Sequence, residues 1–305
     1  MLFDVFFRKN NVIKIYERLL NHKCLSAKQI NQGFYGWVFL IETDDNTKVI
    51  AKVYKQPGYI DTEICQLDMM RKHALVKVPE IYCADYKKDN GCFDILFMEY
   101  INGVNAGAVN ITDEKEKMIF SNQVVENLLA IHAVSNSNGF GSYINDDYCI
   151  SWESCYKAQI TEFYNRIHSK KPILFSKTSF DLMEFLYDSF DSIFCEPVSE
   201  SHLIHGDYNL WNLIADPESK QLIGMIDPFG SCFADRELDL FQLTNANGDY
   251  YGLLDNYKSH IHLSDNFEIK NAYYFFWDDV KHMLNMGYCD NKRFRKNGTI
   301  VKNNL

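Results

Sequence analysis

The sequence is short of the features that mark several classes of protein. It has only 15 glycines and 6 prolines in 305 residues, which excludes collagen-like chains and Gly/Pro-rich disordered chains. Lys and Arg number 31 against 41 Asp and Glu, a net charge of −10, whereas proteins that bind nucleic acids or anionic membranes carry a basic excess. No run approaches the ~20 apolar residues of a membrane-spanning helix. We therefore expect neither nucleic acid nor a membrane as a partner.

Signs of a disulfide framework or of a zinc site are also missing. The nine cysteines are odd in number and no two lie at C-x-x-C spacing, which favours free thiols in a reducing cytosol. The first residues place Asp4 before any apolar run and lack a small-residue cleavage site, so they do not form a signal peptide. The sequence predicts a cytoplasmic protein.

The first hundred residues carry strand signals. Apolar and β-branched runs at 37–42 and 47–54 flank an Asp-Asn tip, which predicts a hairpin. A helix is expected next, because Ile60, Ile64, Leu67 and Met70 recur at helical spacing. Two more strands are predicted, at 81–84 and 93–100.

Helical patterns dominate after Asn102-Gly103. Asp113 and Glu116 form a capping pair for a helix that runs to about residue 132. The same periodicity predicts further helices at 152–168, 180–193, 237–243 and 271–286. The polar, basic tail from Arg293 to Leu305 predicts a frayed end. We therefore expect an α+β chain with its boundary near residue 101.

The most informative stretch for chemistry is 203–240. His205-Gly206-Asp207 is followed five positions later by Asn212, and Asp227 lies fifteen residues beyond that. Turn residues at 216–220 separate two apolar arms, so a hairpin should bring Asn212 and Asp227 to the same end. An amide oxygen and a carboxylate are hard oxygen ligands that suit Mg²⁺. Asp207 lies on the loop before the hairpin, where it can accept a proton.

The order H-x-D-x-x-x-x-N, then Asp after a short hairpin, resembles the catalytic and metal-binding segments of the kinase superfamily. The strings H-G-D and I-D-P, with D-R-E-L-D-L after them, resemble the aminoglycoside phosphotransferase-like small-molecule kinases, and most closely the fructosamine kinase branch. The resemblance implies a two-lobed, protein kinase-like fold. The small β-rich N-terminal lobe is expected at 1–101 and binds the nucleotide, and the larger helical lobe, at 102–305, holds the catalytic and acceptor sites.

The N-terminal third contains candidates for the nucleotide site that this resemblance implies. Lys52 is in mid-strand, and Glu63 falls on the inward stripe of the following helix, where a carboxylate needs a partner. Lys52 would contact the α- and β-phosphates of ATP, held there by Glu63. The remaining candidates are a short nucleotide-covering turn and a hinge whose backbone would bind adenine, and their residues are Gly33, Gly36, Glu99 and Ile101.

The resemblance implies an ATP- and Mg²⁺-dependent phosphotransferase acting on a hydroxyl of a small molecule. Asp207 would be the catalytic base, and Asn212 and Asp227 would hold Mg²⁺. Fructosamine-like sugar amines are the first acceptor hypothesis, with aminoglycosides and related alcohols still open. A nucleotide-binding pseudokinase or regulatory protein without turnover is the alternative. A protein kinase is disfavoured, because only seven residues separate Asp227 from Asp235 and leave no room for a long activation segment.

Several other polar residues allow a structural interpretation beside a functional one. His205 is expected to brace its loop rather than to act as a base. Asp239 is expected to cap a helix or to bind that loop rather than to be a metal ligand. His260 and His262 are expected at the surface, because no third metal ligand is close in sequence. Asp278-Asp279 fits either a site for a cationic substrate or a solvated helix face.

Overall fold

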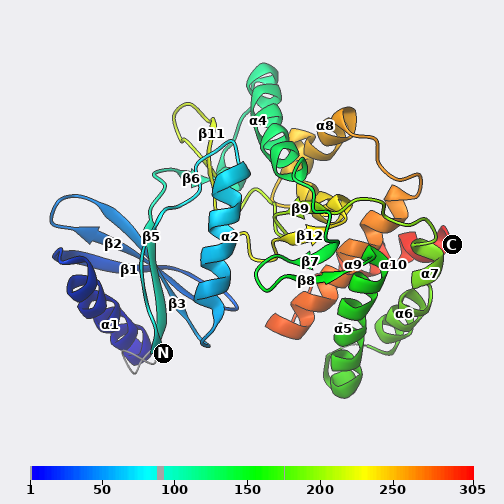
Figure 1. Ribbon diagram of the computed structural model, residues 1–305, viewed down its shortest axis with the longest axis horizontal. Helices are drawn as coiled ribbons and strands as arrows, with labels where there is room; N and C mark the ends of the chain where they lie inside the picture. The colour runs from blue at the N-terminus through cyan, green and yellow to red at the C-terminus, as the bar shows by residue number, and fades with distance from the viewer. Residues whose placement is uncertain (1, 88–92, 175) are drawn as a thin grey trace.

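The computed structural model describes residues 2–87, 93–174 and 176–305, which form two lobes (Figure 1). The smaller lobe contains a five-stranded antiparallel sheet in the order β1-β2-β3-β5-β4. Its strands are β1 (Cys24–Gln32), β2 (Gly36–Thr43), β3 (Lys48–Tyr54), β4 (Ile81–Asp85) and β5 (Asp94–Glu99). The predicted hairpin and the two later strands are thereby confirmed.

The two faces of this sheet pack against different helices. Side chains alternate along β3, so Val49 and Val53 join the apolar cluster of α1 (Leu2–Leu20). Lys52 points to the opposite face, toward α2 (Tyr59–His73), the helix drawn between the sheet and the larger lobe in Figure 1. The predicted helix is confirmed by α2, and the alternation places Lys52 on the side of the interlobe cleft.

The sequence patterns predict neither α1 nor β1. In each case the failure of the prediction has a physical reason. Strand β1 lies at the edge of the sheet, and Ala27 is its one buried residue, so it shows no alternation of apolar and polar residues. Helix α1 contributes Val12, Ile15 and Tyr16 to the core, a short apolar stripe among charged neighbours. Both elements depend on contacts with the rest of the sheet.

The larger lobe is mainly helical and contains two small sheets, with strand orders β11-β10-β6 and β8-β7-β12-β9. The strands are β6 (Val104–Asn105), β7 (Phe140–Ser142), β8 (Asp147–Cys149), β9 (His202–Ile204), β10 (Leu213–Ala215), β11 (Leu222–Met225) and β12 (Cys232–Ala234). The α-helices are α4 (Glu114–His132), α5 (Trp152–Leu174), α6 (Lys177–Asp188), α7 (Phe190–Ile193), α8 (Leu253–His260), α9 (Phe267–Met286) and α10 (Asn291–Asn303). The 3₁₀ helices are η1 (Ala106–Ala108), η2 (Arg236–Thr244) and η3 (Gly248–Tyr251).

The predicted helices of this lobe are found with local differences. Asp113 caps α4 by accepting from the backbone N–H groups of Lys115 and Glu116, both at 3.0 Å. The side chain of Glu116 pairs with Lys220 at 2.9 Å, so the reciprocal half of the capping box is not made. The segment at 237–243 is 3₁₀-helical rather than α-helical.

The expectation of a frayed tail is wrong. Helix α10 is capped by Asp290, whose carboxylate accepts from the backbone N–H groups of Lys292 and Arg293. Its apolar residues Phe294 and Val301 are fully buried against the aromatic core of the lobe. The sequence patterns do not predict this helix, because only two of its four buried residues, Phe294 and Val301, are apolar and most of the rest of the segment is polar and basic.

Two backbone links between the lobes join the same hairpin, β10–β11. The backbone of Lys77, just after α2, bonds to the β11 strand, where the N–H of Met225 donates to its carbonyl at 2.8 Å. The second link is β6, whose Asn105 pairs with Ile214 of β10. The division at residue 101 stays a prediction.

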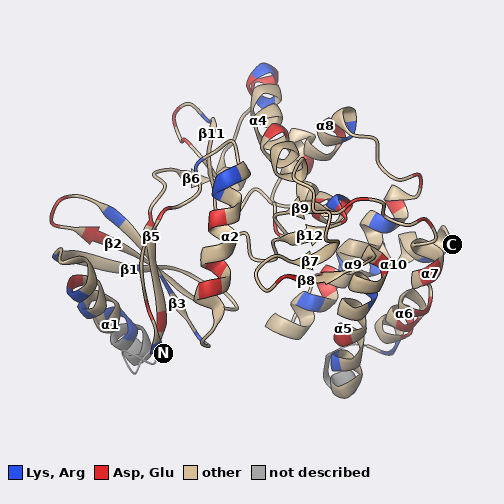
Figure 2. Ribbon diagram, viewed as in Figure 1, with Lys and Arg blue, Asp and Glu red and all other residues tan. Residues whose placement is uncertain are grey.

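Charged residues are distributed over both lobes rather than segregated. Figure 2 shows acidic and basic positions interspersed along the helices. Helix α2 has Asp61 in its first turn and Arg71 and Lys72 in its last turn, an arrangement that complements the helix dipole. No helix in the described part of the chain combines the length and the apolar character that a membrane crossing requires. The eight cysteines that the structure describes are all free thiols.

Candidate active site

Lys52 lies where the two lobes meet. Its Nζ donates to Glu63 Oε1 at 2.5 Å and also to the Asp227 carboxylate from the larger lobe. Tyr54, two residues along β3 and on the same face, donates its hydroxyl to the other oxygen of Glu63. Burial acts to lower the pKa of Lys52, but the carboxylates of Asp227 and Glu63 outweigh it and raise that pKa, so the ammonium stays charged. The structure therefore forms the predicted Lys52–Glu63 pair.

The loop that carries Asp207 is held by its own backbone. The carboxylate of Asp239, on η2, accepts from the backbone N–H groups of His205 and Gly206, both at 2.7 Å. Gly206 has a φ of 82°, and a Cβ there would lie 2.5 Å from the backbone of Gly230, so only glycine fits. Asp239 thus binds the loop, which is one of the two structural roles expected for it.

His205 braces the same loop. Its Nδ1 accepts from the backbone N–H of Asp207 at 3.2 Å, which assigns the proton to Nε2, and Nε2 donates to the carbonyl of Ile226 at 3.2 Å. Burial lowers the pKa of His205, so the imidazole is neutral. Both ring nitrogens are used by the backbone, which agrees with the predicted structural role.

The carboxylate of Asp207 is oriented by two amides. Asn209 Nδ2 donates to Oδ1 and Asn212 Nδ2 donates to Oδ2, each at 2.7 Å. Burial raises the pKa of Asp207 to about 7, although the ammonium of Lys281 acts in the opposite direction. A carboxylate with a pKa near neutrality, held in one orientation, has the properties of a general base.

Asn212 and Asp227 are brought to the same end of the β10–β11 hairpin, as the sequence predicts. The N–H of Ile226 donates to the carbonyl of Asn212 at 2.9 Å, which closes the base of the hairpin. Asp227 follows with a φ of 57°, a left-handed conformation that turns the chain sharply after β11. The Nδ2 of Asn212 donates to Asp207, which leaves its amide oxygen as a second hard donor at the hairpin base that also carries Asp227. This donor set fits Mg²⁺.

A cavity of about 610 Å³ separates the lobes next to Lys52. The backbone N–H of Ile101 makes no hydrogen bond to another backbone group in the part of the chain that the structure describes. The side chain of Glu99 is held aside by Lys77. The residues that bound the cavity are mostly apolar and include Ile50, Leu67, Met98, Glu99, Ile101 and Ile226. A mostly apolar cavity with a backbone donor at its edge can hold a planar heterocycle.

The glycine turn lies over an adjoining cavity of about 160 Å³, whose lining includes Lys52, Asp207 and Asp227. Gly33 and Gly36 both border this cavity. The side chain of Tyr35, between them, contacts Phe229 with ring centroids 3.8 Å apart. This aromatic contact joins the turn to the segment after Asp227, and the motifs in the sequence gave no sign of it.

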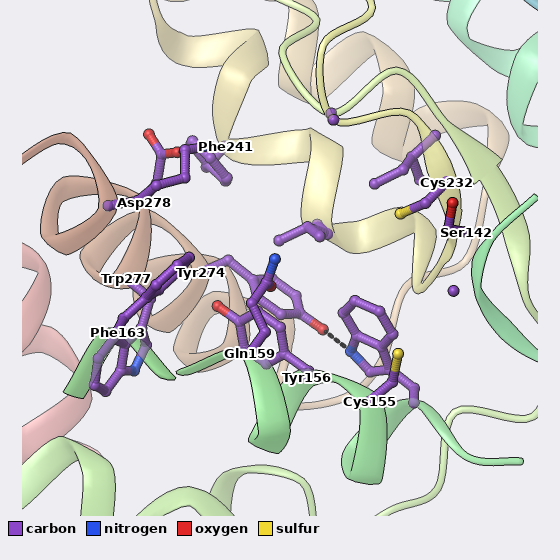
Figure 3. Close-up of a pocket in the computed structure, with 17 residues that line it drawn as sticks. Ser142, Cys155, Tyr156, Gln159, Phe163, Cys232, Phe241, Tyr274, Trp277 and Asp278 are labelled. Carbon is purple, nitrogen blue, oxygen red and sulfur yellow. Dashed lines mark hydrogen bonds and ion pairs between the residues drawn. The ribbon is translucent and has the colours of Figure 1, made fainter. Parts of the chain in front are cut away.

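Two further cavities lie on the side of the larger lobe, and Asp278 borders both. One, of about 380 Å³, is polar and is lined by Asp207, Asn209, Trp211 and Gln242 among others. The other, of about 270 Å³, is mainly aromatic (Figure 3). These cavities offer space for an acceptor beside the candidate base.

The remaining histidine and aspartate candidates are also placed by the structure. His260 and His262 are exposed, in agreement with the structural interpretation. A solvated helix face is wrong for the acidic pair on α9, since Asp279 is fully buried and bonded to Arg293. Asp278 pairs with Lys281 at 2.9 Å and faces the two cavities.

Comparison with known proteins agrees with this geometry. Residues 26–252 match the family described as the phosphotransferase enzyme family. The Escherichia coli K12 protein YcbJ, itself uncharacterized, is 24% identical over 287 residues, which cover 91% of this chain and 92% of that protein.

Solved structures extend the match to the fold. A protein from Haemophilus somnus, named as a candidate fructosamine-3-kinase, superposes with a TM-score of 0.73 at 13% identity and covers 99% of both chains. Aminoglycoside phosphotransferase APH(4)-Ia superposes with a TM-score of 0.70 at 15% identity, over 96% of this chain and 97% of that one. The predicted two-lobed, kinase-like α+β fold is confirmed. The chain belongs to the phosphotransferase enzyme family.

Proposed function

We propose that this protein transfers the γ-phosphoryl group of ATP to a hydroxyl of a small molecule, with Mg²⁺ as cofactor. The observation that carries the proposal is the convergence of the Lys52–Glu63 pair with Asp207, Asn212 and Asp227 between the lobes. The related phosphotransferase APH(4)-Ia has been solved in complex with AMP-PNP and hygromycin B, which supports a nucleotide and a small-molecule acceptor as the two substrates.

The nucleotide is proposed to bind in the interlobe cavity. Its adenine ring would lie in the apolar slot, against the backbone of Glu99 and Ile101. Lys52 would then contact the α- and β-phosphates, with Glu63 fixing the position of the ammonium. The turn from Gly33 to Gly36 would cover the phosphates, since it already borders the same cavity as Lys52.

Asp207 is proposed as the general base. Its carboxylate accepts the proton of the acceptor hydroxyl as that oxygen forms a bond to the γ-phosphorus. The bond from phosphorus to the β–γ bridging oxygen breaks, and ADP leaves with the electron pair. The amides of Asn209 and Asn212 hold the carboxylate in one orientation, so little of its conformational freedom is lost in the reaction.

Asn212 and Asp227 are the residues that would hold Mg²⁺. A bound Mg²⁺ neutralises charge that develops on the phosphate oxygens. Because Asp227 also bonds to Lys52, the proposed metal site and the proposed phosphate site share one carboxylate.

Sugar amines related to fructosamines are the first acceptor class proposed, with aminoglycosides and related alcohols as alternatives. A pseudokinase that only binds nucleotide is the second candidate function. The convergence of Lys52, Asp207, Asn212 and Asp227, to which these roles are proposed, supports turnover over that alternative.

The test is a phosphorylation screen of sugar amines, aminoglycosides and amino alcohols with ATP and Mg²⁺, read as ADP release. Asp207→Asn should slow transfer by roughly 10²–10⁴-fold and leave nucleotide affinity within a few-fold. Asp265→Asn, at an exposed position, is the matched control and should keep the wild-type rate. Binding of Mg-ATP without phosphorylation of any acceptor would instead favour the pseudokinase.

A further inference from the structure

One face of α9 forms a wall of the aromatic cavity. Tyr274, Trp277, Asp278 and Lys281 are spaced i, i+3, i+4 and i+7 along the helix, and all four line the cavity. Figure 3 shows Tyr274, Trp277 and Asp278 projecting from this helix. Lys281 is the cationic side chain among the residues that line this space.

The two charged side chains at this wall, Asp278 and Lys281, differ in how fully their polar atoms are paired within the protein. Asp278 Oδ1 lies 2.9 Å from Lys281 Nζ, and its Oδ2 lies 3.2 Å from His282 Nδ1, so both oxygens face a cationic or titratable partner. An ammonium has three N–H donors, and in the described part of the chain the ion pair of Lys281 is with Asp278 alone. Lys281 therefore retains donors for a ligand, whereas Asp278 does not offer a free carboxylate.

Aromatic rings make up much of the remaining wall, beside the polar side chains of Ser142 and Gln159. Trp152 and Tyr156 stack with centroids 5.2 Å apart and an interplanar angle of 15°. The hydroxyl of Tyr274 accepts from the Trp152 indole and donates to Asp235, both at 2.7 Å. Because these polar atoms are already used inside the protein, the rings offer the cavity an apolar surface that suits an aromatic or aliphatic group.

The polar cavity on the other side of Asp278 has a different character. It contains the candidate base Asp207, the amide of Gln242 and the half-exposed ring of Trp211. Amides and an exposed aromatic ring suit a group with several hydroxyls. The two cavities thus share Asp278, with a polar space that suits hydroxyls on one side and, on the other, a more apolar space that Lys281 lines.

We propose that Lys281 binds a carboxylate of the acceptor, and that the acceptors are sugar-amine adducts of amino acids with apolar side chains. The sugar would lie beside Asp207, the carboxylate at Lys281 and the amino-acid side chain among the aromatic rings. This inference rests on the proposed function and narrows its acceptor class. It disfavours the polycationic aminoglycosides, because the carboxylates that line the two cavities in the described chain, Asp207 and Asp278, are already bonded within the protein.

The test compares two adducts that differ only in the carboxylate, fructosyl-phenylalanine and fructosyl-phenethylamine. The ratio of their kcat/KM values is measured for the wild-type enzyme and for Lys281→Met. The wild-type ratio should favour the carboxylated adduct by about tenfold or more, the range of one hydrogen bond to a charged group. Lys281→Met should bring the ratio to within about threefold of unity. Lys296→Met, an exposed lysine on α10, is the matched control and should keep the wild-type ratio.

The possible failures are separable. Equal kcat/KM values for both adducts in the wild type, or a ratio unchanged in Lys281→Met, overturn the role of Lys281. If neither adduct is phosphorylated, calorimetry with AMP-PNP and Mg²⁺ separates the two hypotheses. Nucleotide binding without turnover of either adduct overturns the acceptor class and leaves the nucleotide site intact. Loss of nucleotide binding in the wild type contradicts the proposed function itself.

Discussion

The ammonium of Lys52 bonds to both lobes at once. It reaches Glu63 on α2 and Asp227 on the loop after β11, and Tyr54 supports Glu63 from the same strand. A buried charge is stable only when it is paired, so removing one member leaves the others without compensation. Function and stability are therefore coupled at this residue.

The Lys52–Glu63 pair predicts a non-additive mutant cycle. Lys52→Ala should reduce phosphoryl transfer directly, and Glu63→Ala should reduce it by releasing the lysine. Because the two residues act as a unit, the double mutant should be little slower than the slower single mutant. The measurement is kcat/KM for ATP in all four proteins. Additive losses in log rate would show two independent residues, and near-wild-type rates throughout would remove Lys52 from the phosphate site.

His205 predicts a dependence of stability on pH. Burial lowers its pKa in the folded protein, whereas the unfolded chain has an ordinary His pKa of about 6.5. The unfolded state therefore takes up the proton first, and the stability that neutral His205 contributes above pH ~6.5 is lost as the pH falls below it.

Urea unfolding at pH 7.5 and pH 5.5 checks this prediction. The wild type should lose more unfolding free energy between the two pH values than His205→Asn does, because the variant lacks the titrating group. The exposed His262→Asn should behave like the wild type. Identical losses in wild type and His205→Asn would contradict it.

At the scale of secondary structure, the sequence predicts those helices and strands whose own residues show a clear apolar periodicity or turn composition. The hairpin β2–β3, helix α2 and the β10–β11 hairpin each have strong periodicity or turn composition, and each is present. Strand β1 and helix α10 bury few residues, so their apolar pattern is weak and only the packed neighbours determine them.

The two glycines of the turn after β1 are expected to respond differently to substitution by alanine. A Cβ on Gly36 would lie 2.0 Å from the carbonyl oxygen of Val53, so Gly36→Ala must displace β2 from β3. Gly33 has nothing within 4 Å of such a Cβ. Gly36→Ala should cost about 1–3 kcal/mol in unfolding free energy and weaken nucleotide binding, while Gly33→Ala should change both little. Thermal unfolding and calorimetry of the two variants check this, and equal effects would count against it.

The packing of helix α10 predicts that a substitution in this C-terminal segment greatly lowers the free energy of unfolding. Phe294 is fully buried, and its ring lies 4.3 Å from that of Phe276 between centroids. Phe294→Ala should cost about 3–5 kcal/mol in unfolding free energy by chemical denaturation. The exposed neighbour Lys296→Ala should stay within about 0.5 kcal/mol of wild type. A small effect at Phe294 would mean that the helix does not contribute to the core.

The candidate site could be predicted only in part, for reasons that are visible in particular residues. Asp207, Asn212 and Asp227 lie close in sequence, and one hairpin relates them. Lys281 approaches the site from a distant helix, and Tyr35 reaches Phe229 across the lobes. Such contacts depend on how the elements pack, which no local spacing encodes.

At the scale of the whole molecule, the net charge of −10 opposes the binding of an anionic nucleotide. The cleft itself adds Asp207, Asp227 and Glu63 against Lys52. AMP-PNP should therefore bind at least roughly tenfold more weakly without Mg²⁺, a difference of about 1.4 kcal/mol. Calorimetric titration with Mg²⁺ and with EDTA measures this. Asn212→Ala should lose most of the difference, and equal affinities in the wild type would contradict a metal site at Asn212 and Asp227.

The attachment of two backbone links between the lobes to the β10–β11 hairpin has a mechanical consequence. If the lobes open and close, the pivot lies on that hairpin, through Lys77 at β11 and Asn105 at β10. Rotation displaces each point in proportion to its distance from the axis. Asn212 and Asp227, at the base of the hairpin, would then stay almost stationary while the small lobe rotates relative to them.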